Sequence, residues 1–149
     1  TAEALLPLSK MTDVVDFPGL VVKGGTNYGN AFTCLKNTIQ TDIADLKKGG
    51  AKVNRPIVFF ISDGEPTDTN WKAAHAQVAD KTWPFSPHII SFGLSGAQAD
   101  TIREVATQVD KKGKSFAYLA DDDASGAVLR EIFNSLLSPI LRDECLEGR

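Results

Sequence analysis

Apolar positions along the chain alternate between short continuous runs and stretches with helical spacing. Five apolar residues in a row occupy positions 57–61, and a second largely apolar run occupies 88–92. Runs of this length, rich in β-branched and aromatic residues, are typical of strands that are covered on both faces. Shorter strand-like runs occur at 4–8, 14–17, 20–22 and 116–119. The pattern predicts short strands, of which those at 57–61 and 88–92 are the most deeply buried.

Between these runs, apolar residues recur every three or four positions, which predicts amphipathic helices. In the first such stretch they are Phe32, Leu35, Ile39, Ile43 and Leu46. Thr26 or Asn27 can cap its start, and two lysines followed by two glycines at 47–50 suit its end. Shorter helices are predicted around 71–78, after a possible cap at Ser95, and near 125–137.

The alternation of strands and helices predicts an α/β fold with a doubly wound, mainly parallel sheet. We find no internal repeat or linker, so residues 1–149 are interpreted as one domain that ends in a tail at 140–149. The net charge is −3 without a long basic run, which argues against a nucleic-acid partner. No apolar run approaches the roughly 20 residues that span a bilayer. Cys34 and Cys145 suit neither a disulfide framework nor zinc, and favour reduced thiols in a cytoplasmic protein.

Ligands of open parallel sheets bind at the carboxyl ends of the strands, so polar loops after strands are candidate sites. One such loop is Gly-Gly-Thr-Asn-Tyr-Gly at 24–29, where glycines let the backbone approach a ligand. It has the glycine spacing of a phosphate-binding P-loop, but Asn30 and Ala31 stand where Lys and Ser/Thr are required. The dinucleotide fingerprint fails because Thr26 replaces its middle glycine. A plain loop with a helix cap is the alternative interpretation.

The second candidate loop is Ser-Asp-Gly at 62–64, directly after the most hydrophobic strand run. A carboxylate such as Asp63, next to a glycine and outside a buried strand, is a natural ligand for a hard cation. An aspartate that starts a turn is the commoner explanation of such a residue. The combination with the Gly-Gly-Thr loop earlier in the chain favours the functional interpretation.

These two segments together, with 57–68 reading Ile-Val-Phe-Phe-Ile-Ser-Asp-Gly-Glu-Pro-Thr-Asp, resemble parts of the metal-ion-dependent adhesion site of von Willebrand factor type A (vWA) domains. The sequence resembles in particular stand-alone bacterial cytoplasmic members, including those grouped with tellurium-resistance proteins. The resemblance implies that Thr26 offers its hydroxyl to Mg²⁺ or Mn²⁺ and that Asp63 binds the ion through water. It also implies that an acidic group of a protein partner fills the last coordination position.

The family's most diagnostic segment, Asp-x-Ser-x-Ser, is absent from this sequence, and the nearest stretch, at 121–125, has the wrong spacing. In the family's strand order 3-2-1-4-5-6, the chain is expected to begin at the third strand. It would then lack the first strand, the first helix and the second strand. We expect either a fragment of a longer product or a second chain, such as the other copy in a homodimer, that covers the exposed sheet. Metal binding by this chain in isolation should be weak or absent.

The main hypothesis is therefore a non-enzymatic protein-interaction module with a partial metal site at Thr26 and Asp63, where the ion bridges to a partner carboxylate when the domain is complete. The rival is a metal-dependent hydrolase or phosphoryl-transfer enzyme with Asp63 at the metal, and a structural remnant without metal is a third possibility. No basic residue near Thr26 or Asp63 is placed to clamp a phosphate, which favours the first hypothesis. Six other residues are interpreted as structural or solvated rather than functional: Glu65, Asp68, Trp71, His75, Trp83 and His88.

Overall fold

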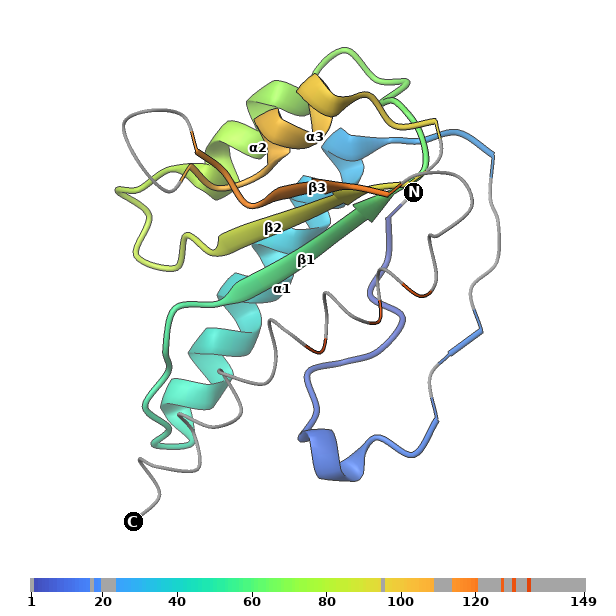
Figure 1. The fold of residues 1–149 in the computed structure, drawn as a ribbon. Coiled ribbons are helices and arrows are strands. Elements are labelled where there is room, and N and C mark those ends of the chain that lie inside the picture. Colours follow the sequence, from blue (N-terminus) through green and yellow to red (C-terminus); the bar gives the residue numbers. More distant parts are fainter. Residues whose placement is uncertain are drawn as a thin grey trace.

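The fold, in a computed structural model, is described for residues 2–16, 18–19, 24–94, 96–108 and 114–120 and for positions 127, 130 and 134. The elements in chain order are η1 (Met11–Asp13), α1 (Tyr28–Lys48), β1 (Ile57–Ser62), α2 (Trp71–Ala79), β2 (His88–Gly93), α3 (Ala99–Val105) and β3 (Ala117–Leu119). The three strands form one parallel sheet in the order β1-β2-β3 (Figure 1). The predicted mixed α/β fold is thus confirmed.

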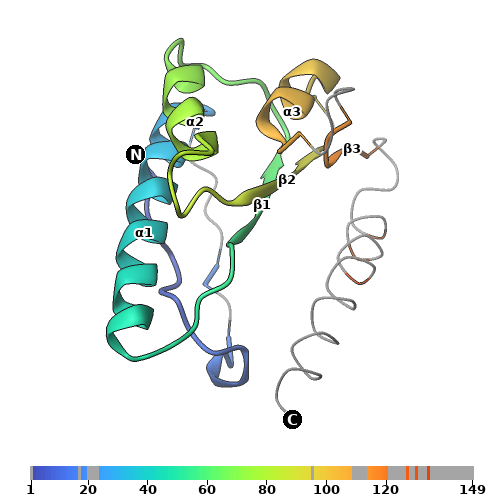
Figure 2. The ribbon, with the colours of Figure 1, turned by 90° about the vertical axis from the view of Figure 1, so that its left-hand side faces the viewer.

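One face of this sheet is covered by the three helices. Paired residues of parallel strands share a face, and Phe60 of β1 pairs with Ser91 of β2. The Phe60 ring stacks on Phe32 of α1 with 5.4 Å between centroids, and the Ser91 hydroxyl donates to the Ile102 carbonyl of α3 at 2.6 Å. Helix α2 packs beside α1, as Figure 2 shows. Helices α1, α2 and α3 therefore lie on the side of the sheet that Phe60 faces.

The core lies between this face and the helices. Its buried members are Tyr28, Phe32, Trp71, Val78, Ile89 and Val105, and Leu35, Val58, Phe60, Ala74 and Trp83 pack against them. Phe32 has no exposed surface and its ring also meets the rings of Tyr28, Trp71 and His75. The predicted apolar face of α1 is confirmed at Phe32, Ile39 and Ile43, whereas Leu46 near its end is exposed.

The ends of α1 follow the predicted capping pattern. Asn27, rather than Thr26, caps the start, because its Oδ1 accepts a hydrogen bond from the Asn30 amide at 2.7 Å. At the other end the Gly49 amide donates to the Asp45 carbonyl at 3.0 Å. Gly50 follows at φ 82°, the left-handed conformation that favours glycine after a helix.

Three sequence predictions differ from the structure or lie outside its described part. Positions 4–8 and 14–16 form no strand: Pro7 lacks an amide donor, and Leu5, Leu6 and Leu8 are exposed. The residue that precedes α3 is Gln98, whereas Ser95 is not described. Residues 20–22, 121–125 and 140–149, with Cys145, are also outside the described residues; of the helix predicted near 125–137 only positions 127, 130 and 134 are described, all helical and exposed.

None of the described helices is long and apolar enough to cross a membrane. The longest, α1, has charged and polar side chains along its outer side, as its sequence requires for a helix with one buried face.

His75 makes the stability of the fold depend on pH. Burial lowers its pKa, although the Val105 carbonyl at 2.9 Å and the charge of Glu104 act in the opposite direction. A histidine in the unfolded chain takes up a proton near pH 6.5, while in the folded chain His75 does so only at a lower pH. The free energy of unfolding should therefore fall as the pH drops below about 6.5, by up to about 1.4 kcal/mol per pH unit for this residue.

Urea unfolding between pH 7.5 and 5.5 measures this effect. His75→Gln keeps an amide that can donate to the Val105 carbonyl but does not titrate, so its unfolding free energy should change less with pH than that of the wild type. His88, whose pKa burial and the charge of Arg55 also lower, leaves a residual slope in both proteins. Equal slopes for the two proteins would show that His75 is not held neutral.

Candidate functional site

Both candidate residues lie at the carboxyl end of the sheet. Asp63 follows β1 directly and is exposed, and Thr26 lies just before α1 and is half-buried. Figure 1 shows the arrowheads of the strands, the beginnings of α1 and α3 and the loop after β1 gathered at one end of the molecule. This is the edge at which parallel sheets bind ligands.

The loop after β1 is joined directly to the segment that carries Thr26. The Thr26 carbonyl accepts hydrogen bonds from the Thr67 amide at 2.8 Å and from the Thr67 hydroxyl at 3.1 Å. A Cβ added to Gly64 would lie 3.4 Å from the Thr26 hydroxyl oxygen. The hydroxyl of Thr26 is therefore beside the backbone of the residue after Asp63, so the structure places Thr26 next to the loop that carries Asp63.

Tyr28, a buried residue of α1, supports the loop after β1 by a hydrogen bond. The Tyr28 hydroxyl donates to the Gly64 carbonyl at 2.9 Å, and the Ser62 hydroxyl donates to the same carbonyl at 3.0 Å. Burial raises the pKa of Tyr28; the hydrogen bond with Ser62 lowers it, and the charges of Glu65 and Asp63 raise it further. The phenol therefore remains a protonated donor at neutral pH and holds the Gly64 carbonyl toward the core.

Asp68, at the far end of the loop, caps helix α1. Its two carboxylate oxygens accept hydrogen bonds from the amides of Tyr28 and Gly29, each at 2.9 Å. These amides belong to the first turn of α1, where backbone N–H groups have no hydrogen-bond acceptor within the helix. A carboxylate there also interacts favourably with the positive end of the helix dipole.

Glu65 does the same for helix α3. One of its oxygens accepts from the Gln98 amide at 2.7 Å and the other from the Thr101 hydroxyl at 2.6 Å. The expectation that Glu65 and Asp68 are solvated loop residues is wrong, because each carboxylate bonds to a helix some 33 to 40 residues away along the chain. The one sequence signal for such a cap is Gly29, a glycine in the first turn of a helix.

Asp63 differs from these two acidic residues. Its side chain is exposed, and among the described residues its carboxylate has no hydrogen-bond partner. Its backbone is nonetheless held, because Gly96 packs against the Asp63 carbonyl and the Leu94 amide donates to the neighbouring Ser62 carbonyl at 2.8 Å. The loop thus presents one free carboxylate on a fixed backbone.

No family model, curated protein or solved structure matches this chain. What the chain does is therefore inferred from its own residues. In the described part of the chain, no three His, Cys, Asp or Glu side chains lie close enough together to hold a metal ion. Thr26 and Asp63 supply hydroxyl and carboxylate oxygen, the donors that Mg²⁺ and Mn²⁺ prefer, so the pair fits such an ion in kind but leaves most of its six positions to other ligands.

The remaining residues considered from the sequence belong to the fold. Trp71 is only 6% exposed and lies in the core, as the structural interpretation predicts. Trp83 is half-buried, with the Lys36 ammonium 5.5 Å from its ring centroid. His75 bonds the Val105 carbonyl, and His88 opens β2 with a buried Nδ1 that has no partner among the described residues. Neither histidine belongs to the loops that carry Thr26 and Asp63.

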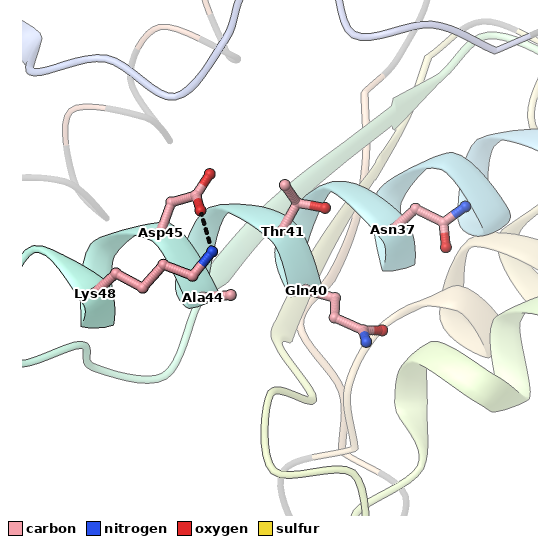
Figure 3. Close-up of a pocket in the computed structure, with 6 residues that line it drawn as sticks. All are labelled: Asn37, Gln40, Thr41, Ala44, Asp45 and Lys48. Atoms are coloured by element: carbon pink, nitrogen blue, oxygen red, sulfur yellow. Dashed lines mark hydrogen bonds and ion pairs between the residues drawn. The ribbon is translucent and has the colours of Figure 1, made fainter.

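A separate hollow lies along the outer side of α1, well away from this site. It is lined by Asn37, Gln40, Thr41, Ala44, Asp45 and Lys48 (Figure 3). Its charged pair, Lys48 and Asp45 at 3.4 Å, is exposed, which makes the pair weak. The hollow begins about 15 Å along the helix from Asn27, at 1.5 Å per residue. Asp45 therefore offers a control for charge changes made at the site.

Proposed function

We propose that the chain is a vWA-type interaction module in which a divalent cation at Thr26 and Asp63 binds an acidic group of a protein partner. The observation that carries this proposal is that the Thr26 hydroxyl lies beside Gly64, the residue after the exposed Asp63, at the carboxyl edge of the sheet. The two loops are 37 residues apart in sequence, and the hydrogen bonds of Thr67 join them. The match of both loops to the adhesion-site motif then has a spatial counterpart.

The strand arrangement also supports the proposal. The order β1-β2-β3 fits the fourth, fifth and sixth strands of the vWA order 3-2-1-4-5-6. In that assignment the side of β1 away from β2 would lie next to the family's first strand, within a doubly wound sheet. Ile57 and Ile61 of β1 are 40% and 45% exposed, as expected for a strand that another segment or a second copy can cover.

The chemistry at the site follows from charge. A bound divalent cation would supply the positive charge that lets Asp63 and a partner carboxylate approach each other. Thr26 would add a neutral oxygen, which leaves part of the charge of the ion for the partner. Asp68 already accepts from two amides of α1, and Glu65 from the Gln98 amide and the Thr101 hydroxyl, so these two carboxylates would compete less with the partner for the ion.

Paramagnetic broadening by Mn²⁺ tests the metal part of the proposal, since it detects even weak binding. In the ¹⁵N-labelled chain, traces of Mn²⁺ should broaden the amide signals of residues 26, 63 and 64 before others, and excess Mg²⁺ should reverse this. Asp63→Asn should remove the effect, whereas Asp45→Asn, with the same charge change on α1, should not. Broadening centred elsewhere, or unchanged in Asp63→Asn, would overturn the site.

Capture of binding proteins tests the partner carboxylate. Any proteins that the immobilised wild-type chain retains in Mg²⁺ should be released in EDTA, and Asp63→Asn should retain none of these. Conversion of the carboxylates of the captured proteins to amides should abolish their binding. Binding that ignores EDTA contradicts the proposal, and metal-dependent hydrolysis of p-nitrophenyl phosphate lost in Asp63→Asn would instead support the enzyme.

A further inference from the structure

We infer that Asp68 and Glu65 are positioning residues, which hold the loop of Asp63 in place by capping α1 and α3. This inference rests on the proposed function, because the loop matters only if Asp63 and Thr26 bind an ion. In sequence these two acidic residues look like solvated members of the loop that carries Asp63. The structure assigns their oxygens to helix amides and a threonine hydroxyl instead.

The Asp68 contact fixes the Thr26 side of the site. Its carboxylate accepts hydrogen bonds from the amides of Tyr28 and Gly29, which lie two and three residues after Thr26. One residue before Asp68, Thr67 donates twice to the Thr26 carbonyl. Residues 67–68 thus bind both the end of the Gly-Gly-Thr loop and the beginning of α1. Without the carboxylate, two amides of the first turn lose their partners, and the hydrogen bonds of Thr67 are left to hold Thr26 to the loop.

The Glu65 contact fixes the Asp63 side. Glu65 bonds the beginning of α3, and two residues earlier Asp63 is in contact with Gly96, which lies just before that helix. The loop is therefore fixed on both sides of Gly64, to α3 through Glu65 and to α1 through Asp68. Because the anchors belong to different helices, the separation of Asp63 and Thr26 depends on where α1 and α3 begin.

Gly29 shows how closely the Asp68 cap is fitted. A Cβ added at this position would lie 2.5 Å from an Asp68 carboxylate oxygen and 3.1 Å from the Asn70 side-chain oxygen. Alanine favours a helix over glycine by about 1 kcal/mol. Gly29→Ala should therefore displace Asp68 without any change of charge, while the intrinsic preference of α1 for the helical state improves. Gly29→Ala therefore tests the position of the Asp68 carboxylate at unchanged net charge.

The experiment compares Gly29→Ala and Asp68→Asn with the wild type by NMR. Both variants should speed amide exchange at residues 28 and 29 by about tenfold or more, the effect of losing a hydrogen bond to a charged group. Both should shift the amide signals of 26 and 63–64, and both should reduce Mn²⁺ broadening there severalfold although Asp63 and Thr26 are intact. Glu65→Gln should shift 63–64 and 98 but leave 28 and 29 unchanged.

Two matched controls make the outcome decisive. Gly49→Ala, where an added Cβ meets only ordinary contacts at 3.4 and 3.6 Å, tests the same change at the other end of α1. Asp45→Asn tests the charge. Unchanged signals at 26 and 63–64 in Gly29→Ala and Asp68→Asn would overturn the positioning role. If the wild type shows no Mn²⁺ broadening at Asp63, the proposed function fails, while the amide exchange and shifts still decide whether Asp68 and Glu65 position the loop.

Discussion

Phe32→Ala is expected to lower the free energy of unfolding by about 3–5 kcal/mol, the usual cost of truncating a buried aromatic residue. Phe32 has no exposed surface and stacks on Phe60, so its removal leaves a cavity between α1 and the sheet. The rings of Tyr28 and Trp71 would also lose an aromatic neighbour. Because small domains are only about 5–15 kcal/mol more stable than their unfolded chains, much of the margin disappears.

Urea unfolding, followed by tryptophan fluorescence and circular dichroism, measures this loss. Phe85→Ala is the matched control, because it removes the same atoms from a half-buried ring that packs on Trp83 and under Lys47. It should cost less than half as much. Similar losses for the two variants would mean that Phe32 is not at the centre of the core. If Phe32→Ala does not fold at all, Phe32→Leu, which keeps more of the volume, still gives a measurable loss.

Gly96→Ala is expected to destabilise the protein by about 1–3 kcal/mol from backbone strain alone and to displace Asp63 as well. Gly96 has a φ of 97°, a backbone conformation that residues with a side chain rarely adopt. An added Cβ would also lie 2.8 Å from the Asp63 carbonyl oxygen, a backbone atom that can move only with its loop. We therefore expect the amide signals of 63 and 64 to shift and Mn²⁺ broadening at Asp63 to decrease.

Gly50→Ala separates the strain from the collision. Gly50 has a similar φ of 82°, but an added Cβ there would meet no atom within 4 Å. Its loss of stability should be smaller than that of Gly96→Ala, and the signals of the Asp63 loop should stay where they are. Equal losses in the two variants, with the loop signals unmoved in both, would show that Gly96 does not support Asp63.

Gly29 and Gly96, the two glycines on which the site depends, differ in whether the sequence alone indicates a special role for them. Gly29 stands inside a helical pattern, where glycine is unfavourable, so its presence points to a close neighbour. Gly96 stands in an ordinary turn after a strand and gives no such indication. Only the packing against the Asp63 carbonyl shows that Gly96 belongs to the site.

Local pattern was sufficient to predict much of the fold. The apolar runs at 57–61 and 88–92 became β1 and β2, and the helical spacing after Asn27 became α1 with its cap and terminal glycine. These features depend on neighbours in sequence, so the residues that decide them can be seen together. The runs at 4–8 and 14–16 failed as strands because a strand also needs a partner, which a local pattern does not supply.

The sequence by itself determined that Thr26 and Asp63 are candidates and that strands and helices alternate. Only the tertiary structure decided what the neighbouring carboxylates do. Asp68 and Glu65 find their donors on α1 and α3, tens of residues away, and a parallel sheet brings those helix ends to the loop after β1. A carboxylate with helix amides in reach becomes a cap, and Asp63, with no partner among the described residues, stays free.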